Sequence, residues 1–405
     1  MKRIFWICLV VLGLFASGSA LAAEKLKIGL TLPMSGLYAE QGKLEHMAMQ
    51  MALKDLDGKI GGRPAEFIIV DTEANPDIAG RRTRALMEKE GVKFLLGDVS
   101  TSSAIAISTV VKENGGLYIN TNANGDDLTS TRAVRNMFRI PPNMSVMARA
   151  VANYAFDNIP GKKWIFLTHD YSWGHSGARW ARDVLKKRGA TEIGELKVPI
   201  GTRDFSAQLL QIRNSGADAV IVTVGGSDRV ALMKQVAEYR IPEKMVYVDT
   251  LTNYVDVWGL KPEERSGFWA AEMSHDESPQ MLEFAKRFKA AFPDAPSPVV
   301  EENSYNGYVG IMALNEAMEK AGTTEDVGKI ILAMEGLEVK RNLRDKPTYI
   351  DPRTHQFMNS MCVVIPDPEA KLPDIWKVVK KVEAAEYEMT EEENPIDLRK
   401  EPLPK

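Results

Sequence analysis

Hydroxyl-bearing residues gather at one junction between an apolar run and a helix-like stretch. The run FLLGD ends at Asp98, and Ser100, Thr101, Ser102 and Ser103 follow in succession. One of them would suffice as a helix cap, because a single side-chain oxygen accepts from the free amides of the first turn. Those amides and the positive end of the helix dipole also form an anion site, to which hydroxyls add neutral donors. We therefore expect an anion to bind here, with helix capping as the alternative.

Two further turns carry residue types suited to recognition. TNANG contains Asn122, Ala123 and Asn124, and each asparagine offers both a donor and an acceptor. An ordinary turn rich in Asn and Gly is the alternative. Trp173 follows another apolar run and could close over the apolar part of a solute. Packing in the core is the alternative for this side chain.

Catalytic patterns are weak in this chain. GHSGA, with Ser176 at its centre, is a near miss for the hydrolase motif G-x-S-x-G, and His275 and His355 are the downstream histidines available for a triad. The segment ends in Ala where the motif requires Gly, and the HGGG-type segment that would form an oxyanion hole is missing. Both observations argue against a hydrolase. No G-x-G-x-x-G follows the first strand, and no P-loop occurs. The five histidines lack i, i+4 pairing and cysteine partners. We expect no enzyme, no metal and no cofactor.

The elements that position these residues alternate along the chain. From Lys25 to about residue 250, short apolar runs are followed by turns and by stretches with helical spacing. The runs are apolar throughout, which indicates parallel sheets covered by helices on both faces. The alternation breaks at Pro141 and Pro142 and then restarts. This pattern predicts a bilobed α/β protein that binds its ligand beyond the carboxyl ends of the strands.

The N-terminus and the charge balance predict compartment and partners. Lys2 and Arg3, the apolar run from Ile4 and the small residues at 20–23 form a Sec-type signal peptide, and the bulky residue before Cys8 argues against a lipoprotein. No other long apolar stretch occurs, so we expect no membrane insertion. The chain has 51 Lys and Arg against 55 Asp and Glu, which argues against a nucleic-acid partner.

An ordered set of segments resembles a known family. TLPMSGLYAEQG, GKIGGRPAEFIIVDTEANP, FLLGDVSTSSA, INTNANGDDLT and THDYSWGHSG are similar to the type I solute-binding proteins of ABC importers, especially the leucine/isoleucine/valine-binding group. The resemblance implies two Rossmann-like lobes with parallel sheets, joined by three crossover strands. The expected division is a signal peptide (1–23), a first lobe (24–140 plus 276–340), a second lobe (141–275 plus 341–380) and a charged, poorly ordered tail (381–405).

The resemblance also implies roles for residues at the strand ends. A hydroxyl at Thr101 would hold the ligand's carboxylate, and the Asn122 to Asn124 turn would be a second contact. Trp173 would cover the ligand, and the segment containing Ser227 would approach it through its backbone. Asp249 or Thr250 matches the position of an acid that binds an ammonium group; Asp249 in the cleft would permit an amino acid, whereas Thr250 there favours an acid without an amine.

The implied function is that of a monomeric periplasmic receptor. It would bind a branched-chain or related amino acid, or an aromatic or aliphatic acid, and deliver it to an inner-membrane ABC permease. A soluble ligand sensor with the same fold is the alternative, and a secreted hydrolase using Ser176 is a more remote one.

Overall fold

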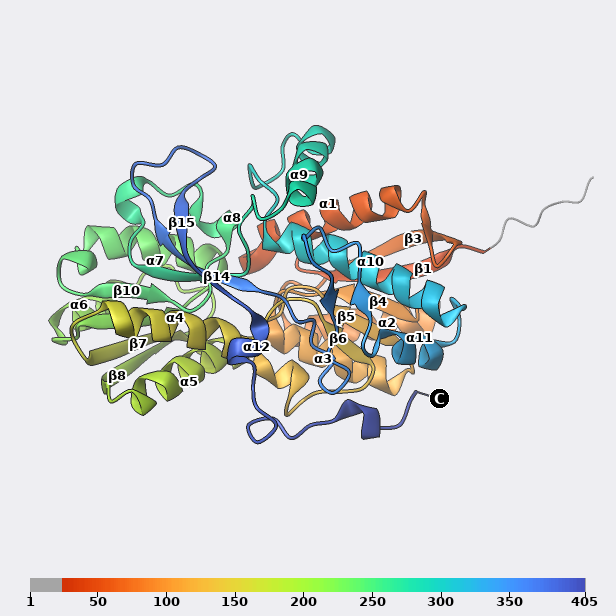
Figure 1. Ribbon diagram of the computed structural model, residues 1–405, viewed down its shortest axis with the longest axis horizontal. Coiled ribbons are helices and arrows are strands. Elements are labelled where there is room, and N and C mark those ends of the chain that lie inside the picture. The colour runs from red at the N-terminus through yellow and green to blue at the C-terminus, as the bar shows by residue number, and fades with distance from the viewer. Residues whose placement is uncertain (1–23, 405) are drawn as a thin grey trace, which may run out of the picture.

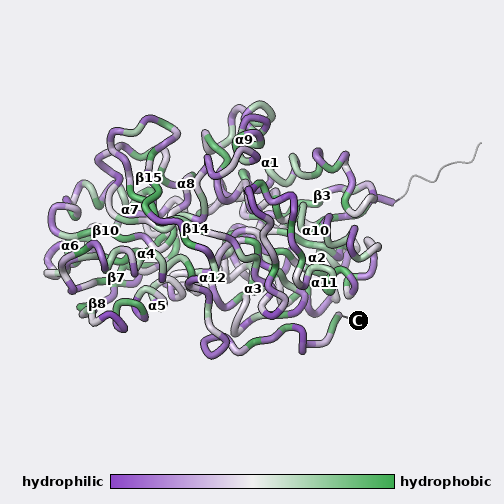
Figure 2. Tube along the Cα trace, viewed as in Figure 1, coloured by the Kyte–Doolittle hydropathy of each residue, from purple (hydrophilic) through white to green (hydrophobic). Residues whose placement is uncertain are grey.

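The computed structural model describes residues 24–404, and the segment predicted as a signal peptide lies outside them. The described chain forms two α/β lobes side by side (Figure 1). Hydrophobic segments run through the interior of each lobe, and the connecting loops are mostly hydrophilic (Figure 2). The bilobed α/β architecture predicted from the sequence is therefore confirmed.

The first lobe contains a six-stranded sheet in the order β2-β3-β1-β4-β5-β6. Every pair is parallel except the β2–β3 hairpin. Helices α1 and α10 cover one face, and α2 and α3 cover the other. The strands are β1 (Leu26–Leu32), β2 (Lys59–Ile60), β3 (Arg63–Asp71), β4 (Phe94–Gly97), β5 (Leu117–Asn120) and β6 (Met137–Arg139). The helices are α1 (Ala39–Asp55), α2 (Pro76–Glu90), α3 (Thr101–Glu113), α9 (Pro279–Ala291), α10 (Glu302–Ala321) and α11 (Val327–Met334).

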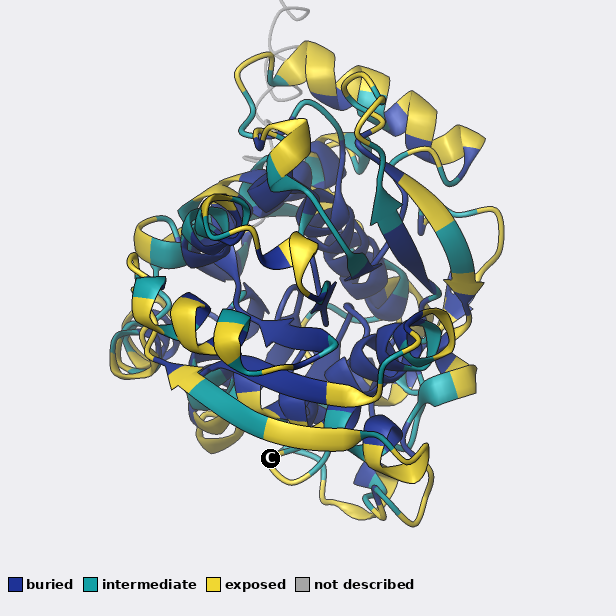
Figure 3. Cartoon of the chain, turned by 90° about the vertical axis from the view of Figure 1, so that its left-hand side faces the viewer, coloured by how far each residue is buried: buried dark blue, intermediate teal, exposed yellow. Residues whose placement is uncertain are grey.

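The second lobe contains a seven-stranded sheet in the order β15-β14-β11-β10-β9-β7-β8. Its inner strands are buried, whereas its edge is exposed (Figure 3). The strands are β7 (Lys163–His169), β8 (Thr191–Val198), β9 (Ala219–Thr223), β10 (Val246–Asp249), β11 (Phe268–Ala271), β14 (Met361–Pro366) and β15 (Trp376–Val382). The helices are α4 (Met144–Asn158), α5 (Ser172–Lys187), α6 (Ser206–Asn214), α7 (Gly226–Glu238), α8 (Tyr254–Val257) and α12 (Ala384–Tyr387).

Three chain segments pass between the lobes, at 140–143, 272–278 and 358–360. The third passage lies later in the chain than expected, because the predicted division assigned all of 341–380 to the second lobe. Strand β13 (Thr348–Tyr349) pairs with β12 (Glu338–Val339), and Gln356 pairs with β6 of the first lobe. Ile350 and Phe357 also belong to the first lobe's core. Strands of two residues carry no periodic signal, so the sequence pattern did not reveal this arrangement.

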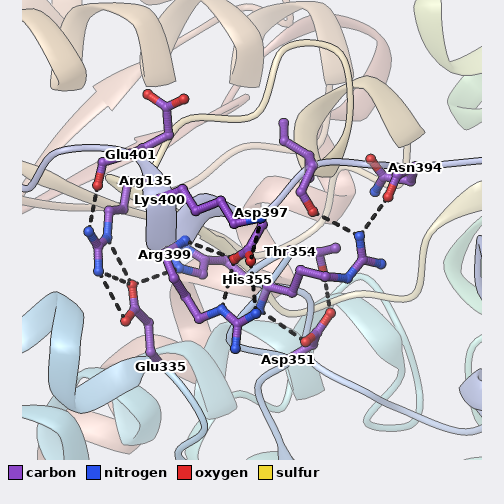
Figure 4. Close-up of polar contacts among 12 residues, drawn as sticks. Arg135, Glu335, Asp351, Thr354, His355, Asn394, Asp397, Arg399, Lys400 and Glu401 are labelled. Carbon is purple, nitrogen blue, oxygen red and sulfur yellow. Dashed lines mark hydrogen bonds and ion pairs between the residues drawn. The ribbon is translucent and has the colours of Figure 1, made fainter. Parts of the chain in front are cut away.

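The segment 381–405, expected to be a poorly ordered tail, begins with the last two residues of β15, and the rest of it that the structure describes (residues 383–404, the C-terminal tail) makes specific contacts. Glu393 pairs with Arg149 of the second lobe, with Oε1 and Nη2 2.6 Å apart. The next residue, Asn394, donates to Thr129 O in the first lobe at 2.9 Å. Leu398 is fully buried. Figure 4 shows the polar contacts that dock the tail on the first lobe. The tail is therefore a fourth passage between the lobes, and its charges have specific partners on both.

Replacing Arg353 by Ala should undock the tail. Its Nη1 donates to the backbone oxygens of Asn394 and Ile396, at 2.6 and 2.8 Å. Because bonds from a charged donor contribute more than neutral ones, we expect the free energy of unfolding to fall by about 2 kcal/mol. Urea denaturation measures this change. Arg399→Ala is the control, because Arg399 pairs with Asp397 inside the tail; equal losses in both variants would contradict the docking role of Arg353.

Candidate functional site

A small cavity lies between the lobes, beyond the carboxyl ends of strands from both sheets. Its volume is about 20 Å³, room for roughly one water molecule, so the lobes are nearly closed on each other. Its position agrees with the general rule for ligand sites in α/β sheets. The first lobe contributes Tyr38, Val99, Asn122, Asn124 and Asn303. The second lobe contributes Tyr171, Trp173, Gly225, Leu251 and Asn253.

Aromatic side chains from both lobes form one side of the cavity. The hydroxyls of Tyr38 and Tyr171 lie 2.7 Å apart across the gap. The rings of Tyr171 and Trp173 have centroids 6.0 Å apart, and Trp173 is held in the first turn of α5. A Cβ at Gly225 would lie 3.3 Å from the Trp173 ring and 3.4 Å from the Tyr38 hydroxyl. Glycine at this strand end therefore permits the two aromatic residues to approach.

Asparagines form another side of the cavity, and each is bound to a buried glutamate. The amide nitrogen of the asparagine is the donor in every pair. The pairs are Asn122–Glu45 (2.7 Å), Asn124–Glu272 (2.8 Å), Asn253–Glu302 (2.8 Å) and Asn303–Glu301 (2.5 Å). The glutamates come from α1, from the segment after β11 and from the start of α10. These hydrogen bonds fix the orientation of the asparagine side-chain amides.

Burial raises the pKa of all four of these glutamates above the ordinary value of that side chain. It raises the pKa of Glu45 to about 8, although bonds from Thr121 and Asn122 act in the opposite direction. Burial together with the nearby charge of Glu302 raises the pKa of Glu272 to about 7. A carboxyl group that is costly to desolvate binds its proton more tightly in the folded protein.

Stability should therefore decrease as pH rises. The pKa of an unfolded glutamate is about 4.3, and that of Glu45 in the folded chain is about 8. Its contribution to stability is fully present below the unfolded pKa and is lost as pH rises through the folded pKa. We expect the free energy of unfolding to fall between pH 5 and pH 8, and Glu45→Gln to make that fall shallower. Urea denaturation across this range measures both slopes. An unchanged slope in E45Q would contradict this assignment, and the exposed Glu88→Gln is the control.

A buried charge cluster lies in the second lobe beside the cavity. Arg229 is fully buried; its Nε is 3.1 Å from Asp249 Oδ2, and its Nη1 is 2.8 Å from Asp256 Oδ2. Burial raises the pKa of Asp249 to about 6, against the lowering effect of Arg229. Asp249 thus faces an arginine, and Thr250 bonds to the hydroxyl of Thr223 at 2.8 Å. Neither of these two predicted site residues lines the cavity.

The hydroxyl cluster at the start of α3 is used largely within the first lobe. Ser100 caps the helix, its Oγ accepting from Ser103 N at 3.5 Å, and it lies 3.1 Å from the hydroxyl of Ser102. The hydroxyl of Thr101 accepts from Gly125 N at 3.1 Å. Val99, directly before the cluster, lines the cavity. Within residues 24–404 the backbone amides of Thr101 and Ser102 have no hydrogen-bond partner.

The remaining predicted site residues are divided between the cavity and its surroundings. Asn122, Asn124 and Trp173 line the cavity together. Ala123 is buried beside them, its amide donating to Asn120 at 3.0 Å. Ser227 accepts from Arg203 at 2.9 Å and lies in a wider groove of about 1020 Å³ along the outer seam of the lobes.

Comparison with known proteins identifies the family. The periplasmic binding protein family model matches residues 25–367. The chain belongs to the periplasmic binding protein family. The resemblance seen in the sequence is confirmed, and a periplasmic binding protein is a transport component rather than an enzyme. This chain is thus the solute-binding component of an ABC transporter. Among residues 24–404, no helix has both the length and the apolar character that a membrane crossing needs.

Individual relatives agree with the family assignment. The Leu/Ile/Val-binding protein homolog 3 of Brucella melitensis is 25% identical over 77% of this chain and 84% of its own. A periplasmic binding protein from Burkholderia mallei has a TM-score of 0.87 at 26% identity, over 93% of this chain and 100% of its own. A solute-binding protein from Rhodopseudomonas palustris BisB5, in complex with 3,4-dihydroxy benzoic acid, has a TM-score of 0.80 at 23% identity. The match covers 89% of this chain and 98% of that protein.

In this periplasmic binding protein, Ser176 helps to join the lobes. Its hydroxyl accepts from the amide of Asp126 in the first lobe at 3.3 Å. The carboxylate of Asp126 accepts from Trp180 Nε1 at 2.7 Å and from Ser145 N at 3.0 Å, both in the second lobe. His275 pairs with Asp374 and His355 with Glu335, so no triad forms around Ser176. The serine is a first-turn residue of α5 with a structural contact.

Sequence reasoning missed several residues that shape the site. Tyr38 stands in a quoted family segment, YAEQG, but nothing in the sequence singled it out. Glu45 and Glu272 lie more than 200 residues apart and meet near the cavity only in the folded chain. Asp126 follows the asparagine turn directly, and its contacts with α4 and α5 depend on how the lobes close.

Proposed function

We propose that this chain binds a small carboxylate-bearing solute between its lobes and delivers it to an inner-membrane ABC permease. The solute is a branched-chain or related amino acid, or an aromatic or aliphatic acid. The observation that carries the proposal is the cavity whose lining comes from both lobes. A ligand shifts the open–closed equilibrium only if it contacts both sides, as this position allows. We further propose export by the N-terminal Sec signal and function as a monomer without a lipid anchor.

The start of α3 supports recognition of a carboxylate. The amides of Thr101 and Ser102 lack partners among the described residues, and Val99 before them lines the cavity. Free amides at a helix N-terminus attract an anion. The ten lining residues include no lysine or arginine. Neutral donors suit a receptor that must release its cargo, because charged pairs hold an anion more strongly.

The aromatic side of the cavity supports an apolar body on the solute. Tyr38, Tyr171 and Trp173 offer ring faces that pack well against a branched chain or another ring. The relatives include proteins named for Leu, Ile and Val and one in complex with 3,4-dihydroxy benzoic acid. These solute classes share a carboxylate next to an apolar group.

Binding requires movement of the lobes. A cavity of about 20 Å³ cannot hold such a solute as it stands. The lobes must open for entry and close again around the solute, by hinge motion about the connecting segments. The closed form then presents both lobes to the permease.

A ligand panel tests the proposal. Thermal-shift measurements with amino acids, aromatic acids and aliphatic acids should find binders. Calorimetry should give a micromolar or lower dissociation constant, which corresponds to a binding free energy of about −8 kcal/mol or more negative. A carboxylate-free analogue of each binder, such as benzyl alcohol for benzoate, should bind far more weakly. Equal binding of the carboxylate-free analogues would contradict carboxylate recognition. Ester hydrolysis, measured alongside, should be absent.

A further inference from the structure

The side-chain amide of Asn124 has only one orientation that is compatible with its neighbours. Its Nδ2 donates to the backbone oxygen of Pro142 at 2.8 Å and to Glu272 Oε1 at 2.8 Å. A backbone carbonyl can only accept, so the amide nitrogen must face Pro142. Both N–H groups are then used, and Oδ1 has no hydrogen-bond partner within residues 24–404. Since Asn124 lines the cavity, its free group there is an acceptor.

Two other asparagines of the cavity also direct the nitrogen of the side-chain amide toward a glutamate. The oxygen of Glu302 that binds Asn253 Nδ2 also accepts from the backbone amide of Tyr254, at 2.9 Å. The oxygen of Glu301 that binds Asn303 Nδ2 also accepts from the backbone amide of Asn303, at 3.3 Å. Backbone amides can only donate, so both glutamate oxygens are acceptors, and the asparagine nitrogens face them.

The fourth asparagine of the cavity is different. Asn122 donates to Glu45, as the others do to their glutamates, but its Oδ1 already accepts from Asn306 Nδ2 at 3.1 Å. Three of the lining asparagines therefore have a side-chain carbonyl oxygen without a partner in the described part of the chain. They are Asn124 and Asn303 of the first lobe and Asn253 of the second.

A carbonyl oxygen between closed lobes costs free energy when nothing donates to it, and a cavity of about 20 Å³ has room for roughly one water molecule. The lining has no lysine or arginine that could donate to these oxygens. The acid position expected to bind an ammonium group, Asp249, is already paired with Arg229. A single water molecule has two O–H donors and cannot satisfy three carbonyls, so a solute that displaces it has to supply the donors instead.

We propose that the solute carries N–H donors, as an ammonium or primary amide group, and that Asn124, Asn253 and Asn303 select it over nitrogen-free analogues. Glu272, Glu301 and Glu302 act as positioning residues that hold the three amides in this orientation. This inference rests on the proposed function, because it assumes that the solute occupies the cavity between the lobes.

Matched ligand pairs test the inference in the full-length mature protein. Calorimetry compares leucine with 4-methylpentanoate and phenylalanine with 3-phenylpropanoate for the ammonium group, and 4-carbamoylbenzoate with 4-acetylbenzoate for the primary amide. The nitrogen-bearing member of each binding pair should bind at least about tenfold more tightly, since a site built for hydrogen bonds rejects the analogue that lacks the donor. Equal affinity, or preference for the nitrogen-free acid, would overturn the inference and leave the proposed function intact. No binding by any pair would count against both.

Variants show whether the three carbonyls cause the preference. Asn124→Leu and Asn253→Leu should lower the ratio of affinities within a pair at least fivefold. Asn122→Leu is the matched control: it removes an asparagine of the same cavity whose carbonyl is already occupied, so it should weaken both members equally. Thermal melts identify a variant that fails to fold, and the more exposed Asn253 site serves if Asn124→Leu does not fold. An unchanged ratio in folded Asn253→Leu would overturn the assignment.

Discussion

Replacing Arg229 by Met should lower the free energy of unfolding by about 3–5 kcal/mol. The guanidinium is fully buried between Asp249 and Asp256, and it also donates to the backbone oxygen of Leu251. Methionine fills much of the same volume but leaves two buried carboxylates without a cation. Removing one partner of a buried ion pair costs this much because the remaining charge is not compensated. Urea denaturation at pH 7 measures the change.

The control for this prediction is Arg240→Met. Arg240 is exposed and lies about 3.8 Å from Glu243, an arrangement that contributes little to stability. A loss of less than about 1 kcal/mol in R229M would contradict the account, because buried carboxylates rarely tolerate the loss of their cation. Such a result would mean that Asp249 and Asp256 bind protons when the arginine is removed.

Replacing Trp173 by Ala should weaken binding of branched or aromatic solutes by about thirtyfold or more, about 2 kcal/mol. The ring is nearly buried, lines the cavity and packs beside Tyr171. A solute with an apolar body loses its main contact with the second lobe, whereas a small polar solute loses less. Calorimetry across the ligand panel measures the difference.

The pattern of losses distinguishes two roles for Trp173. Trp173→Phe should keep most of the affinity, because a ring remains against the solute. Equal losses for large and small solutes in Trp173→Ala would show that the ring supports the lobe's structure instead of contacting the solute.

The fold was largely predictable from local patterns. Apolar runs such as FLLG and AVIVT became buried strands with parallel neighbours, and the proline pair marks a passage between the lobes. The sheets are mixed rather than wholly parallel as predicted, because β14 pairs antiparallel with β11 and β15 at one edge of the second sheet, and β2 with β3 at one edge of the first. The C-terminal tail was not predictable, because its order depends on Arg149 and Arg353, which lie far from it in sequence. A charged composition indicates disorder only when the charges lack partners.

The site was predictable in part. Strand-end reasoning pointed to Asn122, Asn124 and Trp173, which line the cavity. It could not show that Asp249 pairs with Arg229, because that contact depends on how α7 packs on β10. Nor could it show the orientation of the asparagines, which depends on glutamates brought close by the folding of both lobes.

A crystal structure of the chain with the tightest solute from the panel tests the central claim most directly. We expect the solute between the lobes, with its apolar part beside Trp173 and Tyr38 and its carboxylate at the free amides of Thr101 and Ser102. A solute bound outside the space between the lobes, or one whose carboxylate lies away from the start of α3, would contradict this account.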